Sequence, residues 1–254
     1  MAALQALIFD VDGTLADTER DGHRLAFNQA FAEAGLDWQW SIPLYGELLA
    51  VTGGKERIQF FIDRYQPSFS PPADGKAFIA GLHAAKTRIY TELLATGGIP
   101  LRPGVRRFLQ EAYTQGLRLA IATTTTPANV TALLQSVLPD GLTWFEVIGA
   151  GDIVPAKKPA PDIYLYVLEQ MGLQARDCLA FEDSANGLIS AQQAGLTTIV
   201  TVNDYTQEQD FGGAALVLDH LGDPHLPFRR LAGDPGQTTY LDVSLARQIH
   251  QQFA

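Results

Sequence analysis

Two carboxylates stand close together at the end of the first apolar run, in the stretch LIFDVDGTLADTE from Leu7 to Glu19. Asp10 and Asp12 are two positions apart, a spacing that points both side chains to one face of a strand. Gly13 follows directly and predicts that the chain turns away here. The two acids could share one ligand, or they could be an ordinary acidic turn in solvent.

Acidic and basic residues also follow later apolar runs. Glu182 and Asp183 close the run CLAFED, and Lys158 precedes Pro159 ahead of a helix expected to begin near Ala160. Clustered carboxylates repel one another unless a cation or a proton lies between them, and hard oxygen ligands around a phosphate favour Mg²⁺. Lys158 could neutralise a phosphate, or it could be a solvated lysine at a helix start.

A run of threonines from Thr123 to Thr126 closes the run LRLAIA and precedes Pro127. Pro suits the first position of a helix, so Thr126 is expected to cap that helix. Capping explains one threonine only. The others therefore predict a turn whose N–H groups and hydroxyls receive an anion.

These polar residues must be positioned by the apolar runs that they close. Six runs are typical of strands: LQALIFDV, LRLAIATT, FEVIGAG, CLAFED, TTIVTV and AALVLD. Helical spacing alternates with them in GVRRFLQEAYTQG, PANVTALLQSVL, PDIYLYVLEQMG and ANGLISAQQAG. This alternation predicts an α/β protein with a Rossmann-like doubly wound parallel sheet covered by helices on both faces. Ligands of such sheets bind at the carboxyl ends of the strands, where the polar residues fall.

One interval has no convincing buried strand. Between Thr18 and Leu94 the amphipathic patterns DGHRLAFNQAFAEAG, KERIQFFIDRY and KAFIAGLHAAKTRIYTELLA predict helices, and PSFSPPADG is typical of a Pro-rich linker. We therefore expect an inserted α-helical cap of residues 18–94 in a core of residues 1–17 and 95–222. A C-terminal extension, residues 223–254, is expected to pack on the core, with TTYLDVSLARQIHQQFA as a short strand and a closing helix.

Composition excludes several classes of protein. The chain has 254 residues, of which 46% are hydrophobic and 18% charged, enough for one large core and a smaller domain. Its net charge of −10 repels phosphate polymers, so general binding of nucleic acid or anionic membranes is not expected. The single cysteine, Cys178, is expected to be buried at a strand start and excludes an intramolecular disulfide. Without an apolar run of about 20 residues or a basic N-terminal flank, we expect a cytoplasmic protein. We also expect it to be a monomer.

The motifs resemble those of the haloacid-dehalogenase-like phosphohydrolases. FDVDGTLADTE is similar to the first motif of that family and IAT, ending at Thr123, to the second. Lys158 in KKPAPDIY is similar to the third motif and FEDSANG to the fourth. The four motifs occur in the family's order, and the similarity extends from Leu4 to Asp219, including a helical cap inserted after the first motif.

The resemblance implies a role for each motif residue. Asp10 would be the nucleophile that becomes an aspartyl phosphate, and Asp12 would protonate the leaving oxygen and then activate water. The presence of Asp12 argues against dehalogenase chemistry, because dehalogenases of the family lack this second aspartate. Thr123 and Lys158 would bind the phosphoryl oxygens. Mg²⁺ would be held by the carboxylates or the backbone carbonyl of Asp10, Asp12, Glu182 and Asp183.

The inserted helices would choose the substrate. A Gly pair beside basic residues could capture a second phosphate, or it could be an ordinary helix start with surface charges. His23 could equally be a packing histidine, and Lys86 part of an exposed helix stripe. The candidate substrate-binding residues are Glu19, His23, Tyr45, Gly53, Gly54, Lys55, Arg57 and Lys86, with Thr124 and Thr125 from the core.

The cap is similar to that of the β-phosphoglucomutase-like subgroup. DTERDGHRLAFNQAF and VTGGKERI resemble its branch of phosphatases that hydrolyse xylulose 1,5-bisphosphate, an inhibitory by-product of Rubisco in the Calvin cycle, to xylulose 5-phosphate. His23 lies one position further from the first motif than in the mutase pattern, which argues against a mutase-type transfer of acid–base work through His23.

We therefore predict a Mg²⁺-dependent sugar-bisphosphate phosphatase whose partner is a small-molecule sugar phosphate. The first alternative is a phosphosugar mutase that returns the phosphoryl group to the sugar. The second is a binding protein without catalysis, which would not need both Asp10 and Asp12.

Overall fold

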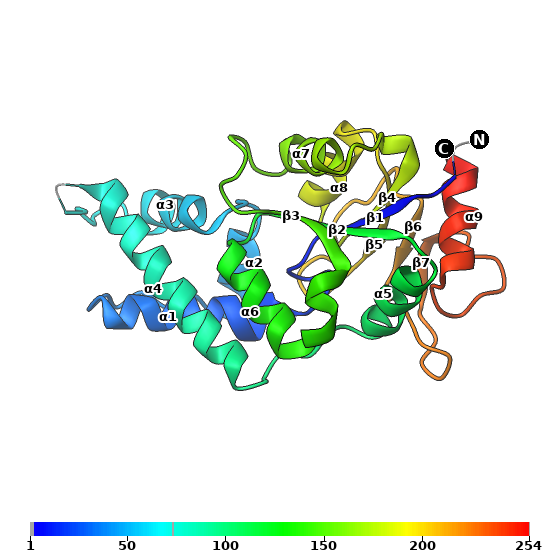
Figure 1. The fold of residues 1–254 in the computed structure, drawn as a ribbon. Coiled ribbons are helices and arrows are strands. Elements are labelled where there is room, and N and C mark those ends of the chain that lie inside the picture. Colours follow the sequence, from blue (N-terminus) through cyan, green and yellow to red (C-terminus); the bar gives the residue numbers. More distant parts are fainter. Residues whose placement is uncertain (1–2, 73, 254) are drawn as a thin grey trace.

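The computed structural model describes residues 3–72 and 74–253, and its centre is a seven-stranded sheet in the order β3-β2-β1-β4-β5-β6-β7 (Figure 1). Strands β1 to β6 are parallel, and β7 is antiparallel to β6. All six predicted strands are present. The strands are β1 (Ala6–Phe9), β2 (Arg118–Thr123), β3 (Phe145–Ala150), β4 (Cys178–Glu182), β5 (Thr197–Thr201), β6 (Leu216–Leu218) and β7 (Arg230–Gly233).

Helices cover both faces of the sheet, which explains the unbroken apolar runs. In β1, Leu7 and Phe9 face one cluster of buried side chains, and Ala6 and Ile8 face another. The Leu7 face packs against α5 (Val105–Thr114), α6 (Pro127–Val137) and α9 (Val243–Phe253). The Ala6 face packs against α7 (Asp162–Met171) and α8 (Ala185–Gln193). Short 3-10 helices at Pro139–Trp144 and Ala175–Asp177 precede β3 and β4. The predicted doubly wound fold is confirmed.

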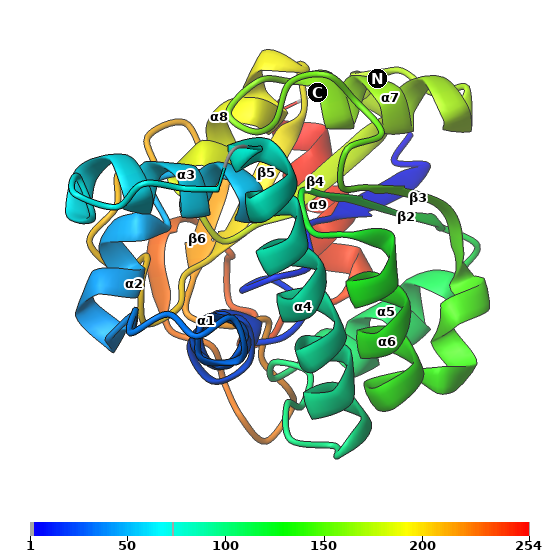
Figure 2. The same cartoon turned by 90° about the vertical axis from the view of Figure 1, so that its left-hand side faces the viewer.

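The segment between β1 and α5 has only helices among its described residues. They are a π-helical turn, η1 (Glu19–His23), and α1 (Arg24–Glu33), α2 (Ile42–Leu48), α3 (Gly54–Tyr65) and α4 (Gly75–Ala95). These helices bury their own aromatic cluster, including Phe27, Phe31 and Trp40. They lie together on the left of the sheet in Figure 1 and face the viewer in Figure 2. Ala73, in the predicted linker PSFSPPADG, lies outside the described residues.

One expectation about local structure was wrong. The stretch TTYLDV has no strand: Leu241 is buried and its N–H donates to the Leu221 carbonyl, but no ladder forms. The last strand is instead β7, all of whose residues are exposed, so no apolar pattern marks it. Helix α7 begins at Asp162, close to the expected start near Ala160.

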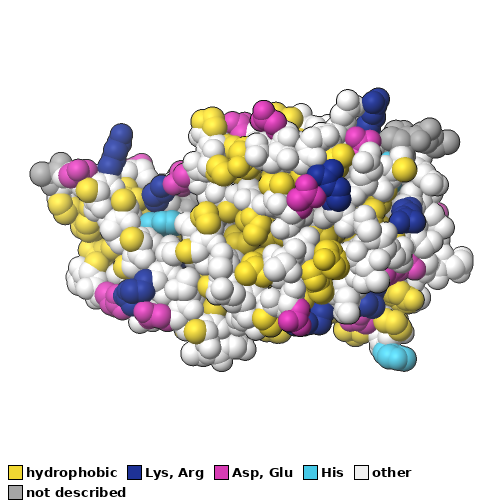
Figure 3. Space-filling view, in the orientation of Figure 1, with side chains coloured by type: hydrophobic (Ala, Val, Ile, Leu, Met, Phe, Trp, Pro, Cys, Tyr) yellow, Lys and Arg dark blue, Asp and Glu magenta, His cyan; other side chains and the backbone are white. Residues whose placement is uncertain are grey.

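Charged side chains of both signs are mixed on the described surface. On the face drawn in Figure 3, acidic and basic side chains are scattered as neighbouring groups rather than gathered into one basic patch. Over residues 3–72 and 74–253, no helix has both the length and the apolar character needed to cross a bilayer. Cys178 is buried at the start of β4, as predicted.

Candidate active site

The candidate site lies where the winding of the sheet reverses. Strand β1 is flanked by β2 and β4, so the chain leaves β1 toward one edge of the sheet and later returns to build the other. The carboxyl ends of these neighbouring strands therefore meet. Asp10, Thr123, Lys158, Glu182 and Asp183 are all buried there. They line a cavity of about 300 Å³ with Asp12, Glu19 and Arg57.

Lys158 is the cation at the centre of the site. Its Nζ donates to Asp10 Oδ1 at 2.7 Å, to Glu182 Oε1 at 2.6 Å and to the Ala122 carbonyl at 2.9 Å. Burial opposes the charge on Lys158, but the two carboxylates outweigh it and raise the pKa of Lys158 above its ordinary value. Lys158 is therefore a fixed positive charge beside Asp10, and the solvated-lysine alternative is wrong.

The three carboxylates of Asp10, Glu182 and Asp183 carry more negative charge than Lys158 balances. Each offers an oxygen within 4.8 Å of the others. Burial, together with Glu182 and Asp12, raises the pKa of Asp10 to about 7 despite Lys158. Burial, Asp10 and Glu182 raise the pKa of Asp183. A hard divalent cation at this cluster would relieve the repulsion, so the donor set fits a metal ion.

Asp12 belongs to a second polar group that joins the core to the helical segment. Thr18 Oγ1 donates to Asp12 Oδ1 at 2.5 Å, and His23 Nε2 lies 2.9 Å from the same oxygen. Lys86 Nζ lies 2.8 Å from His23 Nδ1. Burial disfavours the Asp12 carboxylate, but His23, Thr18 and Lys86 outweigh it, so the pKa of Asp12 is lowered. Burial lowers the pKa of Lys86 to about 8.

The π-helical turn Glu19–His23 explains how His23 reaches Asp12. Its i→i+5 hydrogen bonding accommodates one residue more than an α-helical turn. The additional position noted between the first motif and His23 therefore does not separate the two side chains. The longer spacing therefore gives no reason against acid–base work through His23. His23 and Lys86 are both buried, which also contradicts a surface role for Lys86.

The threonine run divides between structure and site. Thr123 is buried at the end of β2, and its Oγ1 accepts from the Thr125 N–H at 3.3 Å. Thr124 lines the cavity beside Asp10, whereas the Thr125 hydroxyl accepts from the Asn129 amide at 2.9 Å. Thr126 caps α6 through the Asn129 N–H.

Arg57 is the basic residue of the helical segment that faces the cavity. Its Nη1 donates to the Tyr45 hydroxyl at 3.0 Å, and Tyr45 donates to Glu19 Oε2 at 2.5 Å. Lys55 points elsewhere, because its Nζ lies 2.5 Å from Asp152 Oδ2 on the core. Gly53 and Gly54 line a smaller adjoining cavity with His23, His83 and Lys86. The structure thus brings Arg57, Tyr45 and Glu19 to the site and Lys55 to its outer edge.

Three further polar residues were missed in the sequence. The Tyr164 hydroxyl donates to Glu182 Oε1, Asn203 Nδ2 donates to Asp183 Oδ2 at 2.6 Å, and Thr18 donates to Asp12. Asn203 follows TTIVTV, so the rule that ligands meet at strand ends could have found it. Tyr164 lies in an apolar helical stretch, where it reads as core.

Comparisons with known proteins agree with this geometry. A family model described as haloacid dehalogenase-like hydrolase matches residues 4–195. The chain is 54% identical over 227 residues to protein CbbY of Cupriavidus necator, covering 88% of each chain. It resembles the crystal structure of a CbbY mutant from Rhodobacter sphaeroides in complex with xylulose-(1,5)bisphosphate, with 45% identity, a TM-score of 0.80 and coverage of 85% and 94%. A putative β-phosphoglucomutase from Thermotoga maritima matches with 27% identity, a TM-score of 0.61 and coverage of 84% and 94%.

Proposed function

The chain belongs to the haloacid dehalogenase-like hydrolases, and we propose that it is a Mg²⁺-dependent phosphatase that converts xylulose 1,5-bisphosphate to xylulose 5-phosphate. The observation that carries the substrate is the CbbY structure in complex with xylulose-(1,5)bisphosphate, 45% identical with a TM-score of 0.80. The predicted family resemblance is therefore correct. The buried Asp10, the adjacent Asp12 and the cation Lys158 support the reaction type.

In the first step a carboxylate oxygen of Asp10 attacks the phosphorus of the substrate's 1-phosphate. The P–O bond to the sugar breaks, and Asp12 gives its proton to the departing oxygen. Water then attacks the phosphorus of the aspartyl phosphate, Asp12 takes a proton from that water, and inorganic phosphate leaves with Asp10 restored. Lys158, held between Asp10 and Glu182, stabilises the charge on the transferring oxygens.

Asp12 needs both protonation states in this sequence. Thr18, His23 and Lys86 lower its pKa, which suits the base of the second step. The acid of the first step requires a proton, and an arriving bisphosphate favours it, because added negative charge raises the pKa of a nearby carboxyl. On the side of Asp12 that the helices cover, Lys86 Nζ contacts His23. Burial lowers the pKa of Lys86 to about 8.

The carboxylates of Asp10, Glu182 and Asp183 would hold the metal, and the family resemblance adds the backbone carbonyl of Asp12. Asp10, Glu182 and Asp183 are buried together, and their three charges face one lysine. When bound, Mg²⁺ would offset the repulsion between an ionised Asp10 and an incoming phosphate. Asn203 donates to Asp183 Oδ2 at 2.6 Å, and a side chain at Gly13 would collide with the same oxygen, so both positions keep room for Asp183 beside Asp10.

Arg57 is the residue that we propose for the second phosphate. It is buried and lines the same cavity as Asp10, and Tyr45 orients its guanidinium. Arginine suits this task because its fork of donors matches phosphate oxygens. Lys55 is paired with Asp152, and 38% of its side chain is exposed. Replacing Lys55 therefore removes a nearby positive charge that does not face the cavity, and it serves as the control for replacing Arg57.

The test is phosphate release from xylulose 1,5-bisphosphate and from a panel of sugar monophosphates, in Mg²⁺ and in EDTA. We expect the bisphosphate to be preferred and EDTA to abolish release. Arg57→Gln should raise KM for the bisphosphate at least tenfold with little effect on monophosphates, whereas Lys55→Gln should change KM by less than about threefold. Equal turnover of bisphosphate and monophosphates would contradict the substrate proposal, and an unchanged KM in Arg57→Gln would contradict the role of Arg57.

A phosphosugar mutase is the second candidate function. The resemblance to a putative β-phosphoglucomutase, at 27% identity with a TM-score of 0.61, favours it, as does the contact between His23 and Asp12. Product analysis separates the two functions. Interconversion of hexose 1- and 6-phosphates without net phosphate release would replace the phosphatase by the mutase.

Four expectations stay predictions beside this function. They are removal of an inhibitor of Rubisco, a cytoplasmic location, a monomeric state, and the division into core, cap and C-terminal extension at residues 18, 95 and 223. Sedimentation of the purified chain measures the monomeric state, and limited proteolysis at the ends of the helical segment tests the division.

A further inference from the structure

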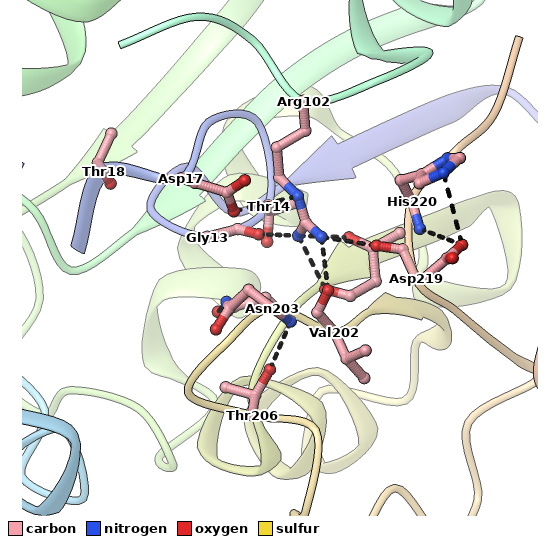
Figure 4. A network of polar contacts seen from close by, with 12 residues as sticks. Gly13, Thr14, Asp17, Thr18, Arg102, Val202, Asn203, Thr206, Asp219 and His220 are labelled. Carbon is pink, nitrogen blue, oxygen red and sulfur yellow. Dashed lines mark hydrogen bonds and ion pairs between the residues drawn. The ribbon is translucent and has the colours of Figure 1, made fainter. Parts of the chain in front are cut away.

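One buried arginine lies where the helical segment returns to the core. Arg102 is only 7% exposed, and its guanidinium donates to backbone carbonyls in three separate loops (Figure 4). Nη1 donates to Thr201 at 3.0 Å and to Gly13, and Nη2 donates to Asp219 at 2.7 Å and to Val202. The network thus ties the turn after β1 to the ends of β5 and β6.

This arrangement gives hydrogen-bond donors to buried backbone carbonyls that would otherwise have none. Carbonyl groups beyond the last pairing of parallel strands have no partner in the sheet, and leaving them buried and unpaired is costly. A guanidinium offers five donors in a plane and stays charged, whereas a lysine offers a single point charge. Asp17 Oδ1 lies 3.2 Å from Nε of Arg102 and completes the set. Arg102 therefore has a structural role. Two of the loops that it contacts, the Gly13 turn and the Val202–Asn203 turn, also reach the carboxylates of the candidate site.

Those two loops meet at Asp183. Gly13, with φ of +85°, approaches so closely that a Cβ there would lie 2.2 Å from Asp183 Oδ2 and 2.6 Å from Asn203 Nδ2. Asn203 follows Val202 directly, and its amide donates to Asp183 Oδ2 at 2.6 Å. Asn203 is itself fixed, because its N–H donates to Thr206 Oγ1 at 2.9 Å. One guanidinium thus sets the backbone on both sides of this carboxylate.

We propose that Arg102 and Asn203 are positioning residues for the metal site. Arg102 holds the Gly13 turn and the Val202–Asn203 turn at a fixed separation, and Asn203 then orients the Asp183 carboxylate toward Asp10. Arg102 does not line the cavity that holds Asp10, whereas Asn203 lines it beside Asp183. This inference rests on the metal-dependent phosphatase proposed above. It states that Arg102 and Asn203 increase the affinity of the metal site for Mg²⁺.

The test is Mg²⁺ binding to the metal-free full chain, measured by titration calorimetry without substrate. The variants are Arg102→Lys and Asn203→Ala. The control is Arg107→Met, because Arg107 also donates to two backbone carbonyls, of Gly222 and Leu241, and neither lies in the Gly13 turn or the Val202–Asn203 turn. Partners that orient a metal ligand typically contribute 10- to 100-fold to affinity, so we expect the Kd for Mg²⁺ to rise roughly tenfold or more in both variants. Arg107→Met should lower the thermal midpoint and leave this Kd unchanged.

Each outcome separates positioning from simple support of the fold. An unchanged Kd in Arg102→Lys and Asn203→Ala, with midpoints lowered as in Arg107→Met, would overturn the inference. If Arg102→Lys does not fold, Asn203→Ala decides alone, since its side chain lies on a partly exposed loop. If the protein without substitutions binds no Mg²⁺, both this inference and the proposed metal site are overturned. If the protein without substitutions binds Mg²⁺ but releases no phosphate from the sugar phosphates, only the proposed function is overturned.

Discussion

Replacing Asp10, the proposed nucleophile, by its neutral isostere should stabilise the metal-free protein while abolishing turnover. The variant Asp10→Asn keeps the shape of the side chain and an oxygen that can accept from Lys158, and it removes the charge. Lys158 keeps Glu182 as its ionic partner at 2.6 Å. The change therefore removes a buried carboxylate without leaving the lysine unpaired.

The magnitude follows from the pKa of Asp10, which burial raises from 3.8 to about 7. A carboxyl whose pKa is raised by folding favours the folded state below pH 3.8, and this contribution is lost as the pH rises through about 7. Above that range the folded protein has to hold an unfavourable charge. Asn avoids it, so the free energy of unfolding should rise by about 4 kcal/mol at pH 8 and by about 2 kcal/mol at pH 5.5.

The assay is urea unfolding in EDTA at both pH values, followed by tryptophan fluorescence. The control is Asp63→Asn, the same chemical change at an exposed position of α3, which should stay within about 0.5 kcal/mol. In excess Mg²⁺ the advantage of Asp10→Asn should shrink, because a bound cation favours the ionised Asp10 of the unchanged chain. A variant that is no more stable at pH 8, or that gains equally at both pH values, would refute this account of the charge balance.

Three further results are expected. A Cβ at Gly187 would lie 1.8 Å from Glu182 Oε2, so Gly187→Ala should displace Glu182 and lower kcat at least tenfold with an unchanged circular dichroism spectrum. Gly81→Ala, on α4 with open space around it, should leave kcat unchanged. Lys158→Met leaves two buried carboxylates without their cation, so urea titration in EDTA at pH 8 should show a loss of about 3–5 kcal/mol, and a loss below 1 kcal/mol would contradict the pairing. Because protons compete with metal at Asp10 and Asp183, the rise in melting temperature caused by Mg²⁺ should be larger at pH 8 than at pH 6, and the opposite order would count against a carboxylate site.

The meeting of Asp10, Thr123 and Glu182 could be predicted from the sequence because each closes an apolar run. Neighbouring parallel strands bring such ends to one edge, whatever the length of chain between them. The same rule did not cover Lys158, which lies in a loop, and there the resemblance to a family was needed. Tyr164 was missed because its hydroxyl lies on a helix that otherwise reads as core.

Elements with little apolar contrast were the ones that could not be predicted. Helix α2 has seven residues, Ile42–Leu48, too few for a helical period to be distinguished. Strand β7 exposes every residue and is held by pairing with β6 alone. The partner of Lys55, Asp152, lies 97 residues away, and no local pattern could relate the two. Long-range polar contacts of this kind decide which residues of the helical segment face the cavity.

The contact between His23 and Asp12 shows why spacing alone is a poor guide to acid–base partners. Counting residues assumes a fixed rotation and rise per residue, whereas the π-helical turn at Glu19–His23 changes both and accommodates one more residue. His23 therefore lies 2.9 Å from Asp12 despite the longer spacing. The longer spacing argued against a mutase in the sequence. Because the contact between His23 and Asp12 is present, that argument no longer applies. The choice between the two chemistries depends instead on whether water or a sugar hydroxyl accepts the phosphoryl group from Asp10, and analysis of the products measures that choice directly.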